Sequence, residues 1–555
     1  MAVTLTDIDH WDAAAIRAVF DAAIERSHGT RTASAALTNT MRLLTFGGDA
    51  ASAAHESARK ATLLLDDHAD ACDAVARAAQ QSADEVAQIK RRLDAIREDA
   101  RDHRLSIDAA TGVATPPAEL PALPPAEHRR IVDAAIRVNA DLQRLLADAE
   151  TADEDLAAAI RGADGDLTPD QVSTQLDRAP QPLPPAPKAG TDPHVVSRWW
   201  HSLAPEQQDR AKQWYPDAIR NLDGIPVPVR NELNVPALRT ELDRLQRGWR
   251  DGSGTWHTDA EKLADLQALD DALHTGTDAS LILLDTTGDP DKALAAVGIG
   301  DVDNAVRVGV TVGGMGTRAS TSAEEMVHEA RAQRGKATEL RCKAGLANAE
   351  AVASIAWLGY DAPDRLAEVT TDGAAQRGAE SLNSFYRGLG ATNNVADRHI
   401  TAFGHSYGSL VTSLAVQQGA PVSDVVLYGS PGTELENAAQ LGVAPGHAYY
   451  EVGVNDLVAE LIPEFGAFGR APQEVPGMTE LSTGTVVAAG GGLGDGELHE
   501  RAYGHAEYPR NGSNGQLRTS GYNMAAVLAG LPADLIMAPP HLILPGLGPI
   551  LTGRK

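Results

Sequence analysis

The sequence predicts two parts of different fold class: an all-α part, and after it an α/β part with a mostly parallel, doubly wound sheet. Residues 1–175 carry only helical patterns, whereas from residue 195 short β-branched runs alternate with helical stretches. Strands that alternate with helices are typical of parallel sheets. A proline-rich segment over 179–187 stands between the two textures and predicts an extended linker. We therefore expect a helical domain over 1–175, a linker over 176–194 and an α/β domain over 195–555.

The helical part is expected to form a helical hairpin with further helices packed along it. Thr6 and Asp7 are candidate N-caps for its first helix, and Phe46-Gly47-Gly48 suits a tight reversal between antiparallel helices. The predicted helices cover 7–27, 34–44, 50–103 and 126–161.

The long helix over 50–103 carries a coiled-coil-like seam. A first set of residues recurs every seven positions, and a second set lies three positions after members of the first. Alternating spacings of three and four are typical of helices that pack side by side. The first set is Leu65, Cys72, Ala79, Val86, Leu93 and Ala100, and the second is Val75, Ile89 and Ile96. We expect this seam to support self-association or binding of a protein partner through residues 1–175.

The α/β part is read from short apolar runs that lie between helical patterns. The predicted strands are 281–285, 306–312, 352–358, 400–403, 425–428, 448–452 and 485–488.

Composition excludes several classes of protein. The formal charge of −28 repels phosphate, so binding of nucleic acid through general electrostatics is not expected. Two cysteines cannot build a disulfide scaffold. The N-terminus lacks the basic and apolar regions of a cleavable signal, and the most apolar stretch, over 524–551, is broken by prolines. We expect no membrane-spanning helix, and either a cytoplasmic protein or one exported without a cleavable signal.

The strongest chemical signal is Gly404-His405-Ser406-Tyr407-Gly408. The preceding run reads as a strand and the following run as a helix. A Gly-x-Ser-x-Gly motif between a strand and a helix is typical of a nucleophile elbow, whose serine hydroxyl projects above the sheet. Ser406 is therefore the candidate nucleophile.

A serine nucleophile needs a carboxylate and a histidine, which follow it along the chain in this arrangement. Asp456 ends the strand-and-loop segment after 448–452, at the sheet edge where sites of α/β proteins lie. We expect Asp456 to be the acid. Glu451 and Asp424 are weaker alternatives.

His505 is the candidate base. It follows the predicted last strand over 485–488 and the Gly490-Gly491-Gly492 loop, and it precedes the final helix. His499 is its competitor, and His541, in the proline-rich tail, is a poor candidate.

An oxyanion hole requires two backbone N–H groups. One is expected from Tyr407, which follows the nucleophile, and the other from the glycine-rich loop after 306–312. Gly314 and Met315 are both candidates for the second donor.

Competing motifs are incomplete. The loop over 313–317 lacks the Gly-Lys-Ser/Thr ending of a phosphate-binding loop, and Gly298-Ile299-Gly300 lacks the third glycine of a dinucleotide fingerprint. Asp285, Asp289 and Asp291 are expected to be turn residues because no glutamate completes a calcium loop. No metal and no organic cofactor are implied.

The C-terminal region, over about 195–530, resembles the α/β-hydrolases, and within them an actinobacterial family of unknown function with a helical N-terminal region. The elbow, the loop Val310–Thr317 and the segment Gly504–Tyr508 carry this resemblance, as do Trp200–Leu203, Asn221–Pro226, Arg230 and Asn234. The resemblance implies an α/β-hydrolase fold and a Ser406, Asp456 and His505 triad, but no particular substrate.

The N-terminal region is similar, more weakly, to the helical hairpins of type VII secretion substrates. Those hairpins carry Trp-x-Gly at the turn and a tyrosine in the export signal. This chain carries Phe46-Gly47-Gly48 and no tyrosine before Tyr215, which argues against export by that route.

Together these patterns predict a serine hydrolase that acts on a small-molecule or lipid acyl compound, in the first place a carboxylic ester. An amidase, thioesterase or lipase would use the same fold. The rival class is a catalytically silent hydrolase fold that serves as a helical interaction module. The segment 462–478, with two phenylalanines among glycines and prolines, is a candidate lid or acyl-pocket wall.

Overall fold

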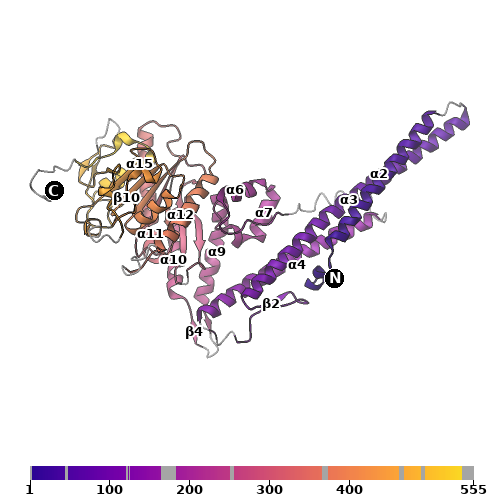
Figure 1. Ribbon diagram of the computed structural model, residues 1–555, viewed down its shortest axis with the longest axis horizontal. Coiled ribbons are helices and arrows are strands. Elements are labelled where there is room, and N and C mark those ends of the chain that lie inside the picture. The colour runs from indigo at the N-terminus through magenta and orange to yellow at the C-terminus, as the bar shows by residue number, and fades with distance from the viewer. Residues whose placement is uncertain are drawn as a thin grey trace, which may run out of the picture. The chain divides into compact units, whose positions relative to one another are not determined.

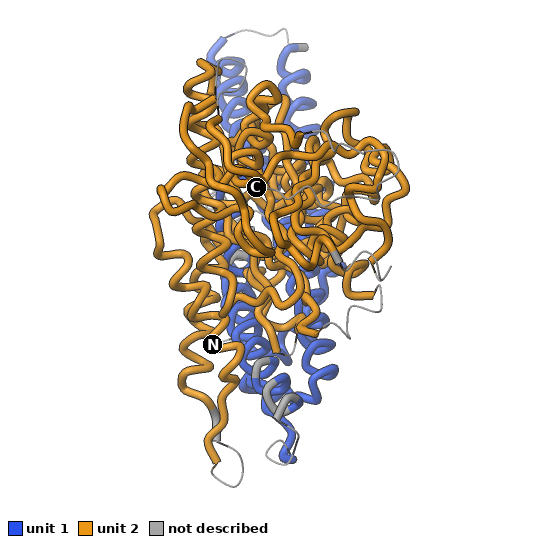
Figure 2. Tube along the Cα trace, turned by 90° about the vertical axis from the view of Figure 1, so that its left-hand side faces the viewer, with its two compact units in different colours: residues 1–185, 203–214, 251–254 blue, residues 186–202, 215–250, 255–555 orange. Residues whose placement is uncertain are grey.

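The computed structural model describes residues 3–43, 48–119, 123, 125–163, 183–250, 255–289, 291–365, 373–461, 468–488 and 494–539. The chain divides into two compact units, coloured separately in Figure 2. Unit 1 comprises residues 1–185, 203–214 and 251–254, and unit 2 comprises residues 186–202, 215–250 and 255–555. The domain boundaries expected from the sequence stay a prediction.

Unit 1 is built from helices and one short β-hairpin. Its helices are α1 (Leu5–His10), α2 (Ala13–Leu43), α3 (Asp49–Asp102), α4 (Pro125–Ala163) and α7 (Pro205–Trp214), and its strands are β1 (Ser106–Asp108) and β2 (Val113–Thr115). Figure 1 shows α2 and α3 side by side as a long hairpin. Their ion pairs, Arg17 to Asp84 at 2.6 Å and Arg31 to Asp70 at 2.8 Å, show that the two helices are antiparallel.

Part of the predicted seam of α3 lies in the interior of unit 1. Val86, Ile89 and Leu93 are buried, and Ile89 and Leu93 share a core with Leu142 and Leu145 of α4. Burial of these side chains, each worth about 1.5–3 kcal/mol, is what makes so long a helix stable.

Three details of the predicted helices are wrong. The helix predicted over 7–27 is divided, because α1 ends at His10 and α2 begins at Ala13. The expected break between 27 and 34 is absent, because α2 runs unbroken from Ala13 to Leu43. Ser27 is buried, and its hydroxyl binds Asp73 and lowers the pKa of that carboxyl, so the partner helix satisfies a polar residue that looked like a helix end. The first N-cap is Thr4, which forms a capping box with Asp7.

Unit 2 contains an eight-stranded sheet in the order β12-β11-β10-β9-β7-β8-β6-β5. Its strands are β5 (Ala279–Asp285), β6 (Leu294–Ile299), β7 (Arg307–Val312), β8 (Val352–Leu358), β9 (His399–His405), β10 (Asp424–Tyr428), β11 (Ala448–Glu451) and β12 (Thr479–Glu480). The pairs from β12 across to β8 are parallel, and β6 is antiparallel to both of its neighbours. The predicted mostly parallel sheet is confirmed.

The sequence reading missed β6 and β12 and misassigned one strand. Residues 485–488 were expected to form the last strand of the sheet. Instead β13 (Val486–Val487) pairs with β14 (Leu498–His499) in a separate antiparallel ribbon. The edge position belongs to β12, whose two residues are too few to give a periodic signal.

The helices of unit 2 are α6 (Pro193–Ser202), α8 (Pro216–Ile219), α9 (Val227–Arg247), α10 (Ala260–His274), α11 (Ala319–Lys343), α12 (Gly373–Ala391), α13 (Tyr407–Gln417), α14 (Leu457–Leu461) and α15 (Thr519–Ala529). Its two remaining strands, β3 (Trp249–Arg250) and β4 (Trp256–His257), form a short ribbon.

The sheet has an apolar layer on each face. Along β10, Val425 and Leu427 pack in one core with α12 and α13, whereas Val426 and Tyr428 pack in another with α11 and α15. This alternation with a period of two is what places helices on both faces of a parallel sheet. The carboxyl ends of β7, β9, β10 and β11 meet at one edge, where ligand sites of such sheets lie.

Several predicted features fall outside the described residues. They are the turn residues 46–47, the linker residues 179–182, the lid residues 462–467, the loop 490–492 and the tail with His541. Among the helices that the structure describes, none is long and apolar enough to cross a membrane.

Candidate active site

Ser406 lies in a sharp turn between β9 and α13. Its φ of 52° and ψ of −127° belong to a region that residues with a side chain rarely adopt. The turn is held because the Ser406 N–H donates to the carbonyl of Tyr428 at 3.1 Å, and the Ser409 hydroxyl donates to the carbonyl of Ser406 at 2.6 Å. The serine thus sits at the carboxyl end of its strand and directly before a helix N-terminus.

The two glycines of the motif allow the close approaches that this turn requires. A Cβ at Gly404 would come within 2.7 Å of the Cα of Ser409, and one at Gly408 within 2.5 Å of the carbonyl oxygen of Gly313. Side chains at these two positions would push apart the strand, the helix and the loop after β7. The lack of space for a Cβ explains why both positions of the elbow are glycine.

The loop over 313–317 passes directly beside the serine. A Cβ at Gly314 would lie 2.6 Å from the Cβ of Ser406 and 3.1 Å from its Oγ. The Tyr360 hydroxyl donates to the carbonyl of Gly313 at 2.8 Å, and the Gly316 N–H donates to the carbonyl of Pro363 at 2.8 Å. The loop is therefore fixed on both sides of Gly314, whereas the Met315 side chain is half exposed.

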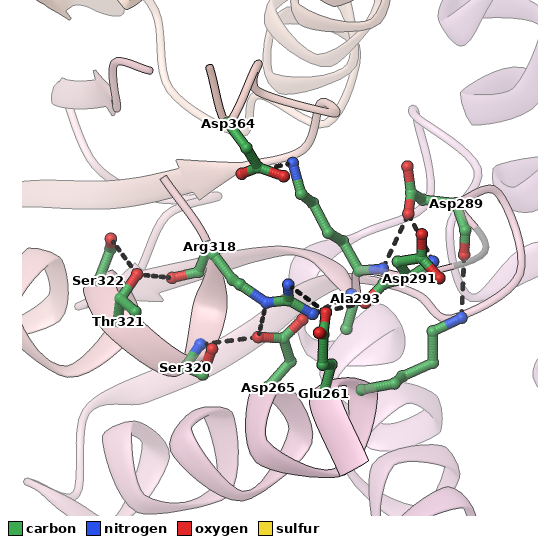
Figure 3. A network of polar contacts seen from close by, with 12 residues as sticks. Glu261, Asp265, Asp289, Asp291, Ala293, Arg318, Ser320, Thr321, Ser322 and Asp364 are labelled. Atoms are coloured by element: carbon green, nitrogen blue, oxygen red, sulfur yellow. Dashed lines mark hydrogen bonds and ion pairs between the residues drawn. The ribbon is translucent and has the colours of Figure 1, made fainter. Parts of the chain in front are cut away.

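A polar network anchors the end of this loop (Figure 3). The buried carboxylate of Asp265 accepts from Arg318 Nε at 3.0 Å, from the Ser320 N–H at 2.9 Å and from the Ala293 N–H at 3.1 Å. Arg318 is the N-cap residue of α11 and has no side-chain cap of its own, so Asp265 supplies the capping acceptor from α10.

The three aspartates considered for a cation site take part in turns. Asp285 accepts from the Thr287 N–H at 2.8 Å, and Asp289 accepts from the Asp291 N–H at the same distance. Asp291 offers its backbone carbonyl to Arg318 at 2.5 Å. They are the turn residues that the sequence predicted.

Asp456 and His505 are in direct contact. His505 Nδ1 lies 2.9 Å from Asp456 Oδ1 and 3.0 Å from Oδ2. Burial alone would raise the pKa of Asp456, but the hydrogen bonds of His505 and Tyr508, together with the charge of His505, hold the pKa below its ordinary value. An ionised Asp456 fixes the proton of a neutral His505 on Nδ1, which leaves Nε2 free to accept a proton.

Asp456 also starts α14. Its Oδ1 accepts from the N–H groups of Val458 at 3.0 Å and Ala459 at 3.2 Å. An aspartate that caps a helix is the simplest structural explanation for Asp456. The same carboxylate both caps α14 and contacts His505. Its orientation is therefore set by the helix as well as by the histidine.

Backbone contacts join the loop of the acid to the loop of the base. The Gly504 N–H donates to the carbonyl of Val454 at 2.8 Å, and the Val454 N–H donates to the carbonyl of Ala502 at 3.2 Å. A glycine is required at 504, where φ is 73°. The pairing holds His505 in register with Asp456.

Sequence reasoning missed two residues that surround this pair. Tyr508 donates its hydroxyl to Asp456 Oδ2 at 2.6 Å and accepts from the Gly453 N–H at 2.6 Å. His405, inside the elbow motif, donates from Nε2 to the carbonyl of His505 at 2.8 Å and stacks on the ring of Tyr428. Burial, helped by the charge of His505, lowers the pKa of His405 to about 4, so His405 is neutral near pH 7. A tyrosine three positions after His505 was the only sequence signal for either contact.

The alternative acids and bases have other surroundings. Glu451 is fully buried, burial raises its pKa well above the ordinary value, and its carboxyl accepts no hydrogen bond from the residues that the structure describes. Asp424 contacts His447 at 2.6 Å. His499 is buried, with Nε2 at 3.1 Å from Asp495 and Nδ1 at 2.6 Å from the carbonyl of Leu517.

Ser406 and His505 line the same cavity, which has a volume of about 210 Å³. Gly314 and Met315 form part of its wall, and His405 and Tyr428 also contribute. Another wall comes from α11 and from the residues after His505, and it includes a polar cluster in which Arg510 contacts Glu325 at 2.6 Å and Glu329 at 3.3 Å. Burial, together with the charge of Glu325, raises the pKa of Glu329 to about 7.

The described part of the candidate lid packs inward. Phe468 is buried, and its ring meets the ring of Tyr407 edge to face, with centroids 6.0 Å apart. Val475 belongs to the core beside α12 and α13. Neither residue lines the cavity of Ser406.

Two family matches cover different parts of the chain. Residues 289–467, which include the elbow and Asp456, match a family described as "Alpha/beta hydrolase". Residues 41–198 match a family described as "Uncharacterised protein Rv0964c".

The similar curated proteins are themselves uncharacterised. The chain is 68% identical over 265 residues to the uncharacterised protein Rv0963c of Mycobacterium tuberculosis, covering 48% of this chain and 100% of that protein, and a Mycobacterium bovis protein gives the same values. A second M. tuberculosis protein, the uncharacterised Rv2079, is 28% identical over 435 residues, covering 68% of this chain and 63% of that protein.

Among solved structures, a dienelactone hydrolase-like promiscuous phosphotriesterase from metagenomic libraries matches with 16% identity and a TM-score of 0.25, covering 46% of this chain and 98% of that one. An esterase of Pyrobaculum calidifontis matches with 15% identity and a TM-score of 0.24, covering 53% of this chain and 97% of that one. The elbow, the parallel sheet and the family match of residues 289–467 lead to one conclusion: this chain belongs to the α/β-hydrolase superfamily.

Proposed function

We propose that the protein is a serine hydrolase that cleaves a carboxylic ester, with Ser406 as nucleophile, His505 as general base and Asp456 as the orienting acid. The observation that carries the proposal is the contact of His505 Nδ1 with Asp456 at 2.9 Å, because His505 also lines the cavity that contains Ser406. The positive φ of Ser406 supports it, because strained backbone clusters at functional sites.

The proposed reaction has two halves. The Ser406 oxygen attacks the acyl carbon while His505 takes its proton, and the carbonyl electron pair moves onto the oxygen. The N–H of Tyr407 and an N–H of the Gly314–Met315 loop bind this oxyanion. The alcohol then leaves with the proton from His505. Water attacks the acyl carbon while His505 takes a proton from it, and the acid leaves as His505 returns that proton to the Ser406 oxygen.

Labelling with a fluorophosphonate tests this proposal. The Ser406 oxygen should displace fluoride from phosphorus in the wild type, whereas Ser406→Ala should stay unlabelled. Ser513→Ala, which alters an exposed serine outside the cavity, is the control and should label like the wild type. A folded wild-type protein that does not label would remove the enzyme proposal and favour the silent interaction module.

The type of acyl bond needs a separate comparison. Acetate esters, thioesters and anilides of matched size, assayed with the wild type, separate an esterase from a thioesterase and an amidase. p-Nitrophenyl esters of increasing chain length separate a short-chain esterase from a lipase. We expect the short ester to be preferred, because the cavity beside Ser406 is small and has a polar wall.

A second role is favoured for unit 1. Leu63 and Leu64 of α3 are 53% and 70% exposed, which is unusual for adjacent large apolar residues and indicates a contact surface. We propose that this surface supports self-association. Sedimentation of the full chain should show a smaller assembly for the Leu63→Glu, Leu64→Glu double variant than for the wild type, and equal masses would contradict this role.

A further inference from the structure

The cavity of Ser406 does not end at its polar wall. A second cavity, of about 500 Å³, lies over α10 and α11 and shares Ser322, Glu325, Glu329, Pro509 and Arg510 with the first. We propose that the second cavity binds the alcohol part of the ester, and that this alcohol is an uncharged polyol, such as glycerol or a sugar. The inference rests on the proposed function and names its substrate class.

The lining of the second cavity is rich in hydrogen-bonding groups. Hydroxyls come from Thr275, Ser320, Thr321 and Ser322, and an amide comes from Asn511. The apolar part of the lining is limited to small side chains: three alanines and one proline. An alkyl chain placed here would remove water from these polar groups without replacing its hydrogen bonds, whereas a polyol offers a donor and an acceptor at every hydroxyl.

Charge argues against an ionic alcohol part. Arg510 reaches both Glu325, at 2.6 Å, and Glu329, at 3.3 Å, so the guanidinium already occupies the space between the two carboxylates that a cation would need. Glu325 compensates the charge of Arg510, and Glu324 adds a further negative charge to the lining, which disfavours a phosphate or carboxylate. A neutral ligand that bonds to donors and acceptors alike is the class that fits this lining best.

The hydroxyl groups are held on a rigid support. Figure 3 shows Ser320, Thr321 and Ser322 in the first turn of α11, whose backbone Asp265 and Arg318 fix. Thr321 and Ser322 lie within hydrogen-bond distance of each other, at 3.2 Å. Hydroxyls placed by a helix rather than by a loose loop form a pre-organised surface for binding.

The test compares acetate esters whose alcohol parts match in size. Glycerol 1-acetate and pentyl acetate have alcohol parts with the same number of heavy atoms, and hydrolysis of both is followed by pH-stat titration. We expect kcat/KM to be about tenfold or more higher for glycerol 1-acetate, because each additional hydrogen bond favours the polyol. Acetylcholine and O-acetylglycolate serve as the cationic and anionic arms and should both be poorer than glycerol 1-acetate.

Variants locate the preference in the second cavity. Thr321 and Asn511 line that cavity but not the cavity of Ser406. The double variant Thr321→Val, Asn511→Leu should lower the ratio of kcat/KM for glycerol 1-acetate to kcat/KM for pentyl acetate about threefold to tenfold. Thr287→Val is the matched control, because Thr287 is exposed, bonds to Asp285 through its hydroxyl and lines neither cavity.

Equal or better hydrolysis of pentyl acetate, or a preference for either charged ester, would overturn the inference. So would an unchanged preference in the double variant. Binding provides a readout that does not need turnover: saturation-transfer NMR of glycerol 1-acetate should give a signal with Ser406→Ala that the double variant weakens. If the wild type labels with fluorophosphonate but Ser406→Ala gives no such signal, the polyol inference alone is overturned. Absence of labelling in the wild type overturns the proposed function.

Discussion

Two histidines that lie close together in the sequence of unit 2, His499 and His505, each contact an aspartate, but the surroundings of their rings differ. In the pair of His499 and Asp495 both ring nitrogens contact protein acceptors, and neither side chain is exposed. In the pair of His505 and Asp456 only Nδ1 has a side-chain partner among the described residues, and the ring is 30% exposed in the cavity of Ser406. A histidine with both nitrogens engaged is a structural crosslink, whereas one with a nitrogen turned to a cavity has capacity left to move a proton.

The largest effect is expected from replacing the members of the two pairs one at a time. His505→Gln or Asp456→Asn should lower kcat by about 10⁴-fold, because the base loses its proton acceptor or its correct tautomer. His499→Gln should leave kcat of the folded protein unchanged and should instead lower the free energy of unfolding by about 2 kcal/mol. Esterase kinetics beside urea unfolding measure both. A large loss of kcat in folded His499→Gln would break the comparison.

The next largest effect is expected from Asp265, a buried carboxylate that anchors the loop beside Ser406. Asp265→Asn keeps the shape of the side chain but loses acceptor capacity for three donors, so we expect kcat to fall about 10²-fold as the Gly314–Met315 loop shifts. We expect the KM to change little. A purely structural defect would lower only the folded fraction, whereas a displaced loop lowers the kcat of the folded protein.

The matched control for this variant is Glu261→Gln. Glu261 binds the same guanidinium of Arg318 at 2.9 Å, but its side chain is 70% exposed, and it should affect kcat less than twofold. If Glu261→Gln and Asp265→Asn behaved alike, Asp265 would have no role in positioning the loop.

Glu329 contrasts with Asp456, because burial raises the pKa of Glu329 whereas the hydrogen bonds of Asp456 keep its pKa low. Its pKa of about 7 lies above its ordinary value of 4.5, so the folded protein binds an extra proton between these values. The free energy of unfolding should therefore fall by about 2 kcal/mol as the pH rises from 4.5 to 7. Glu329→Gln should flatten this part of the stability profile, and the exposed Glu324→Gln should not. Urea titrations at each pH provide the measurement.

The smallest effect is expected from the Tyr508 hydroxyl, which donates a hydrogen bond to Asp456. Tyr508→Phe removes a hydrogen bond that lowers the pKa of Asp456, so this pKa should rise and kcat should fall about threefold to tenfold. The wild type has the stabilisation from ionised Asp456 above pH 3.8 and loses it as the pH falls through the lowered pKa; Tyr508→Phe should lose less on acidification. Tyr503→Phe, whose hydroxyl binds only Asn455 among the described residues, should match the wild type.

Much of the α/β part was predictable because its signals are local. The runs that form β7 to β11 are apolar and bounded by turn residues, and the elbow motif marks Ser406 by type and spacing. The choice of Asp456 and His505 followed from chain order and strand ends. The structure brings the two together, and their catalytic roles stay a prediction.

The missed features depend on partners that are remote in sequence. Ser27 looked like a helix end until Asp73 of the next helix satisfied its hydroxyl. β6 was missed because its small residues, Ala295, Ala296 and Gly298, give a weak strand signal, although antiparallel neighbours on both sides complete its hydrogen bonds. The anchoring of the loop by Asp265 spans 53 positions from Arg318 and has no local pattern at all.

The positive φ of Ser406 makes catalytic activity and thermal stability conflict at this one position. Glycine would adopt φ 52° and ψ −127° without strain, so the inert glycine variant should unfold at a higher temperature than the native protein. A lineage that no longer needed the hydroxyl would gain stability by losing it. The persistence of serine at this site, across descendants of one ancestor, would then itself measure selection for chemistry.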